Sequence, residues 1–77
     1  MRETSSDAPV DILEELRHLV DGNGEVLEEY GGFAIRILDE RRFPWPEVCQ
    51  YLLRLSHEVW IERRGDGLYL VSKPSVD

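Results

Sequence analysis

Apolar residues recur at short helical intervals near the start of the chain: Val10, Ile12, Leu13, Leu16, Leu19 and Val20. Spacing of three and four positions places such residues on one stripe of a helix. Asp7 or Asp11 can cap the start of this helix, and Gly22-Asn23-Gly24 would end it. The pattern therefore predicts a helix over residues 9–21.

The segment from Gly24 to Arg42 fits two periodicities. Read as strands, residues 26–30 and 33–37 flank Gly31-Gly32, and a turn at these glycines would place Val26 opposite Ile37. Read as a helix, residues 33–41 carry an apolar side formed by Phe33, Ala34, Ile37 and Leu38. Periodicity alone leaves both interpretations open.

In the second half of the chain, prolines and glycines mark the ends of the elements more clearly. Pro44 and Pro46 force an extended approach to a helix that begins near Pro46 and runs to about Ser56. Strand-forming residues follow in 57–64 and 68–71, on either side of Gly65-Asp66-Gly67. Asp-Gly between two such runs predicts a β-hairpin, and Pro74 would end its pairing.

The length of 77 residues suits one small domain. We expect a disordered tail over 1–8, a single α+β domain over 9–74 and a frayed end over 75–77. In so small a domain Trp45 and Trp60 are expected in the core or at its edge. Cys49 is the single cysteine, so no internal disulfide can form, and no Cys/His cluster has zinc-site spacing. We expect no metal and no cofactor.

No run of about 18 apolar residues and no secretory signal pattern is present, so a cytoplasmic protein without a membrane partner is expected. The chain also lacks the G-x-S-x-G, P-loop and H-E-x-x-H motifs. A core of this size leaves little room for a catalytic pocket. We therefore expect a protein that is not an enzyme.

Charge is distributed unevenly along the chain. Residues 1–35 carry nine acids and two bases, whereas residues 36–77 carry seven of each, which gives the net charge of −7. An acidic chain usually repels phosphate backbones. Charge alone therefore favours a protein partner over a nucleic acid.

The stretch from Ile37 to Val71 resembles winged helix-turn-helix proteins of the transcription-regulator type. The residues that carry the resemblance are the spaced leucines of a helix, an apolar strand and an arginine-containing hairpin, namely Leu52, Leu55, Glu58, Trp60, Ile61, Glu62, Arg63, Arg64, Gly65, Asp66, Gly67, Tyr69 and Val71. The resemblance implies a small winged-helix-like α+β domain with a C-terminal β-hairpin wing. It also implies that the second helix of the motif covers residues 33–41.

In that family the helix beginning at Pro46 would enter the major groove of double-stranded DNA. The resemblance then implies that Gln50 and Arg54 contact base edges and that four arginines contact phosphates, namely Arg41, Arg42, Arg63 and Arg64. The expected function is that of a non-enzymatic transcription regulator or accessory factor. Since one copy with so few bases would bind weakly, a homodimer through the helix over 9–21 is expected.

A second interpretation follows from a weak internal repeat. Glu25-Val26-Leu27 before one glycine turn resembles Glu58-Val59-Trp60 before the other. A duplicated αββ unit would give an αββαββ domain with a four-stranded antiparallel sheet. That domain would be an acidic protein-protein interaction module without nucleic-acid binding, with Trp45, Tyr51 and Tyr69 as anchors.

Overall fold

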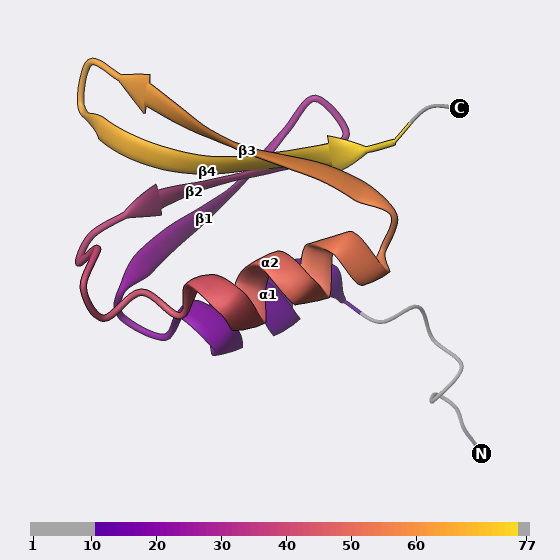
Figure 1. Cartoon of the computed structure of the whole chain (residues 1–77), viewed down its shortest axis with the longest axis horizontal. Coiled ribbons are helices and arrows are strands. Elements are labelled where there is room, and N and C mark those ends of the chain that lie inside the picture. The colour runs from indigo at the N-terminus through magenta and orange to yellow at the C-terminus, as the bar shows by residue number, and fades with distance from the viewer. Residues whose placement is uncertain (1–10, 76–77) are drawn as a thin grey trace.

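The computed structural model describes residues 11–75 and shows two helices and a four-stranded antiparallel sheet (Figure 1). The elements in chain order are α1 (Ile12–Val20), β1 (Gly24–Glu29), β2 (Gly32–Ile37), α2 (Trp45–Arg54), β3 (His57–Arg64) and β4 (Gly67–Pro74). A small α+β domain is therefore confirmed. The tail expected over 1–8 and the last two residues of the frayed end lie outside the described residues.

Helix α1 lies within the range 9–21 predicted from the apolar stripe and begins at Ile12, while residues 9 and 10 and the alternative cap Asp7 lie outside the described residues. Asp11 caps its start, because a carboxylate oxygen of Asp11 accepts a hydrogen bond from the Glu14 backbone N–H at 3.4 Å. Asp21 ends it with a positive φ of 53°. Leu16 and Val20 of this helix are buried against the sheet. The apolar stripe of this helix therefore contributes to the core of one chain.

The ambiguous segment is a β-hairpin, and the helix expected over 33–41 is wrong. Strand β2 pairs with β1 on one side and with β4 on the other. The turn is Tyr30-Gly31, with φ values of 50° and 81°, as a tight two-residue hairpin turn requires. Val26 therefore lies opposite Ile35, and not opposite Ile37 as a turn at Gly31-Gly32 would require.

Gly32 belongs to the strand because only a residue without a side chain fits there. A Cβ atom at this position would lie 2.0 Å from the backbone oxygen of Ser72 on β4. The glycine thus allows the backbones of the two central strands to approach closely.

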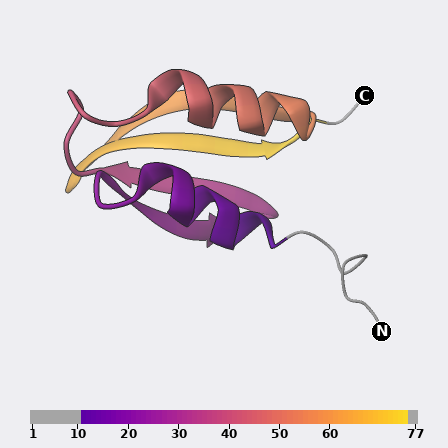
Figure 2. The same cartoon turned by 90° about the horizontal axis from the view of Figure 1, so that it is seen from below.

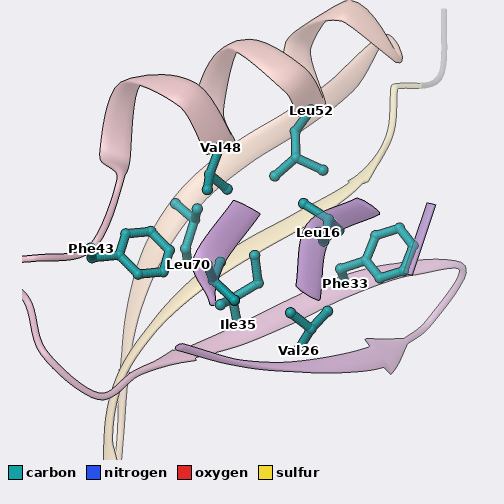
Figure 3. Packing of buried hydrophobic residues seen from close by; sticks show 9 residues of the cluster. Leu16, Val26, Phe33, Ile35, Phe43, Val48, Leu52 and Leu70 are labelled. Carbon is teal, nitrogen blue, oxygen red and sulfur yellow. The ribbon is translucent and has the colours of Figure 1, made fainter. Parts of the chain in front are cut away.

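The strands lie in the order β1-β2-β4-β3, so β2 and β4 are central and β1 and β3 form the edges. Both helices cover the same face of the sheet, as the two views together show (Figures 1 and 2). The main core lies between the helices and this face. Its buried side chains, most of them labelled in Figure 3, are Leu16, Val20, Val26, Phe33, Ile35, Phe43, Val48, Leu52 and Leu70.

Helix α2 begins one residue before Pro46 and ends at Arg54, slightly earlier than expected. Trp45 is held at its start, because its indole N–H donates to the backbone oxygen of Glu40 at 2.9 Å. The Trp45 ring also packs edge-on against Phe43, with centroids 4.7 Å apart. None of the helices within residues 11–75 is long and apolar enough to cross a membrane.

One polar pair is buried on the helix side of the sheet. His57 Nδ1 lies 3.1 Å from the Ser72 hydroxyl, and the imidazole stacks on the ring of Phe33 with centroids 6.1 Å apart. Burial lowers the pKa of His57 below its usual value. The neutral imidazole is therefore the form that fits this position.

Candidate interaction surface

The face of the sheet opposite the helices is here called the open face. Cross-strand partners share a face, and successive residues of a strand alternate between faces. The row Val26, Ile35 and Leu70 points into the main core. The neighbouring row therefore lies on the open face, and it consists of Leu27, Ala34, Val71 and Trp60. The side chains of the open face are those of Glu25, Leu27, Glu29, Ala34, Arg36, Glu58, Trp60, Glu62, Arg64, Tyr69, Val71 and Lys73.

Three residues of the open face are buried although neither helix covers them. Ala34, Tyr69 and Val71 are 0%, 5% and 6% exposed and form a second apolar cluster. They lie on the central strands β2 and β4. The ring of Tyr69 is covered by Arg64, a long side chain of the same face.

Arg64 is the main side chain of that cover. Its two terminal nitrogens donate to both carboxylate oxygens of Glu29 at 2.7 and 2.8 Å, and its Nε donates to Glu62 at 2.7 Å. The guanidinium carbon lies 4.5 Å from the centroid of the Tyr69 ring, in cation–π geometry. All three nitrogens of Arg64 thus have a carboxylate partner.

The contact between Arg64 and Glu29 also indicates the shape of the sheet. Arg64 lies on β3 and Glu29 on β1, which are the two edge strands. In a flat sheet these edges would be about 14 Å apart, at roughly 4.8 Å per strand. The two residues also lie toward opposite ends of the sheet, since Arg64 pairs with Gly67 at the start of β4 whereas Glu29 pairs with Gly32, next to the residue that pairs with Ser72. Because the two side chains meet directly, the sheet curls toward them and the open face is concave.

Charges on this face shift the pKa values of their neighbours. The hydrogen bonds from Arg64 lower the pKa of Glu29 and of Glu62. The Tyr69 hydroxyl donates to Asp66 at 2.8 Å, which lowers the pKa of Asp66 and raises that of Tyr69. Each shift favours the protonation state that holds the network together at neutral pH.

A hollow of about 390 Å³ lies beside this network. Val71 contributes its apolar lining, and Trp60, which is 37% exposed, lines it together with Tyr30. The charged side chains that line the hollow are Glu29, Glu62, Arg64 and Lys73. Its volume lies at the lower end of the range of sites that bind small molecules or single large side chains.

The six residues expected to contact DNA do not gather on one surface. Arg64 is bound to carboxylates on the open face, whereas Arg63 lies at a helix-side position of β3. Arg41 and Arg42 lie in the loop before α2, where the Asp39 carboxylate accepts their backbone N–H groups. Gln50 and Arg54 lie on α2 and line a shallow groove together with Glu15, Glu47 and Tyr51.

The three expected protein anchors are also separated. Trp45 and Tyr51 lie on α2, on the helix side of the sheet, while Tyr69 lies under Arg64 on the open face. The Tyr51 hydroxyl is buried without a hydrogen-bond partner in the described chain, and burial raises the pKa of Tyr51. Of these three residues, only Tyr69 lies on the open face.

Two important residues of the open face are not among the site residues that the sequence predicts. The sequence predicts Trp60 in the core or at its edge and indicates no role for Glu29. Alternation along 57–64 places Trp60, Glu62 and Arg64 on one face and would have grouped them. No local signal connects Glu29 with Arg64, since 35 positions separate them. Comparison of the chain with protein-family models, curated proteins and solved structures gave no match.

Proposed function

We propose that this domain is a non-enzymatic protein-interaction module that binds its partner through the open face. The observation that carries the proposal is the hollow on this uncovered face, lined by Trp60 and Val71 and held in shape by Arg64. Interfaces place aromatic side chains beside such hollows, since a ring buries much area at little cost in conformational entropy.

The chemistry of the hollow favours an apolar anchor from the partner. Arg64 and Lys73 are the cations that line the hollow, and the nitrogens of Arg64 already bind Glu29 and Glu62. A phosphate or carboxylate ligand that binds Arg64 would have to displace these carboxylates. An aliphatic or aromatic side chain, by contrast, can fill the space against Val71 and Trp60 without disturbing the network.

The same observations favour a protein over DNA as the partner. Arg63 and Arg64 point to opposite faces of β3, and Gln50 and Arg54 share their groove with two glutamates. A phosphate backbone needs several bases on one continuous surface. Binding to duplex DNA is the competing outcome that the test detects.

The test is selection of peptides from a random displayed library, followed by mapping of amide chemical-shift changes on the labelled domain. We expect selected peptides to shift the amides of Leu27, Ala34, Trp60 and Val71. Trp60→Ala should weaken binding at least about tenfold, as loss of an aromatic anchor does. Leu53→Ala is the matched control, because Leu53 is 59% exposed on α2.

Two results would overturn the proposal. One is a set of peptides whose shifts map to the helices and whose affinity survives Trp60→Ala. The other is binding to random duplex DNA that weakens steeply with added salt and is lost on Arg41→Ala, Arg42→Ala and Arg54→Ala. Thermal melts of each variant show that the fold is retained.

A further inference from the structure

We propose that the free edge of β3 pairs with β3 of a second copy of this chain, antiparallel, and joins the two four-stranded sheets into one. This inference concerns the edge of the sheet and is independent of what binds the open face. It rests on the length, the exposed apolar residues and the charge order of β3.

Strand β3 offers a long edge with apolar residues at its centre. All eight of its residues pair with β4 on one side, and no other described strand pairs with its second side. Trp60 and Ile61 at the middle are 37% and 49% exposed. A long edge with unpaired backbone groups and exposed apolar side chains is a template for another strand.

The faces of the sheet limit the registers available to such a pair. Residues directly opposite each other in an antiparallel pair point to the same face, so a symmetric pairing must match even positions with even ones and odd with odd. Two such registers use nearly the whole strand. One centres on Ile61 and the other on Trp60.

Charge decides between these two registers. Centring on Ile61 places Glu58 of each copy opposite Arg64 of the other and brings the two Ile61 side chains together at the symmetry axis. Centring on Trp60 places Glu58 opposite Glu62 twice. The nitrogens of Arg64 already have partners within their own chain, so avoidance of like charges makes the choice. Like charges directly opposite each other destabilise a pair, and we therefore assign the register centred on Ile61, which avoids the two Glu58–Glu62 contacts.

The charged residues at the other edge of the sheet are all acidic. Strand β1 is shorter and carries Glu25, Glu28 and Glu29 without any basic residue. Two copies of β1 would bring six carboxylates together with no cation on either strand to offset them. Self-pairing is therefore expected at β3 and not at β1.

Pairing at β3 would extend the interaction surface. The symmetry axis of this pairing is perpendicular to the sheet, so the open faces of both copies lie on the same side. Glu58 would then lie close to Arg64 of the second copy, which already binds Glu29 and Glu62 within its own chain. The helices of both copies remain on the opposite side.

The test is sedimentation equilibrium over micromolar to millimolar concentrations, with the mass compared with that of the 9.0 kDa chain. We expect a reversible dimer. Ile61→Lys places two like charges opposite each other at the axis and should raise the dissociation constant at least about tenfold. A mass of one chain throughout the concentration range would overturn the proposal.

A charge reversal tests the register itself. Glu58→Arg places arginine opposite Arg64 and should weaken the dimer severalfold, although it reduces the net negative charge of the protein. Glu28→Arg on β1 is the matched control with the same change in charge, and it should leave the dimer unchanged or tighten it. Tightening by Glu58→Arg, or equal effects of the two reversals, would overturn the proposal.

Fold and open face are checked on the same variants. Circular dichroism and thermal melts identify any variant that does not fold. Ile61 lies on the helix-side face of β3, so Ile61→Lys should retain peptide binding at the open face as a monomer. Loss of dimerisation and loss of peptide binding are therefore distinguishable.

Discussion

The two faces of this sheet are buried in different ways. On the helix side, aliphatic and aromatic side chains of α1 and α2 pack on the strands and exclude water. On the open face lies the smaller cluster of Ala34, Tyr69 and Val71, in which a salt-bridged arginine covers the ring of Tyr69. Stability should therefore depend mainly on the helix side, whereas the open face remains accessible to a partner beside its own cover.

Truncation in the helix-side core should have the largest effect. Leu52 is fully buried, so Leu52→Ala should lower the free energy of unfolding by about 2–5 kcal/mol. Leu53→Ala at the adjacent exposed position should change it by no more than about 0.5 kcal/mol. Urea unfolding followed by circular dichroism measures both, and equal effects would contradict the assignment of the core.

The second largest effect should come from acid, which protonates the carboxylates that bind Arg64 on the open face. The pKa values of Glu29 and Glu62 are lowered by Arg64. A carboxyl whose pKa is lowered by folding stabilises the native state above its unfolded pKa, near 4.5 here, and that contribution disappears as the pH falls through the folded pKa. Stability measured from pH 6 to pH 3 should therefore decline.

Arg64→Met isolates this effect. The substitution keeps an apolar cover over Tyr69 and removes the cation, so the decline between pH 6 and pH 3 should become shallower. Titration of the Glu29 carboxyl by NMR should show its pKa moving back up toward the ordinary value. An unchanged Glu29 pKa would show that Arg64 is not its main partner.

His57 should give a smaller change in a different pH range. Its pKa is lowered in the folded chain by burial, so the native state binds fewer protons than the unfolded state. The contribution of His57 to stability is therefore fully present above about pH 6.5, the unfolded pKa, and is lost as the pH falls through the folded pKa. His57→Gln should remove the difference between unfolding at pH 7.5 and at pH 5.5.

The Tyr51 hydroxyl should give the smallest change. Within residues 11–75 it is buried and has no hydrogen-bond partner, so Tyr51→Phe removes an unsatisfied polar group and keeps the ring. The free energy of unfolding should stay the same or rise by up to about 1 kcal/mol. A clear loss of stability would show that the hydroxyl has a partner in solution.

Residues 32–37 explain why the sequence left one segment ambiguous. Ala34 and Ile35 are both fully buried, one on the open face and the other in the main core. A central strand buried on both faces loses the alternation that identifies a strand, and a short apolar run can then be mistaken for a helix. The same absence of alternation occurs in β4, where the Gly65-Asp66 turn marked the hairpin independently.

The sequence by itself determined the elements that carry local signals. Asp11 and the apolar stripe specify α1, the prolines around Trp45 position α2, and the Gly65-Asp66-Gly67 run specifies the β3–β4 hairpin. Only the tertiary structure decided that residues 32–37 form a central strand and that Glu29 meets Arg64. Both depend on pairing between distant segments, which local periodicity does not encode, because a strand gains its partners only when the whole sheet forms.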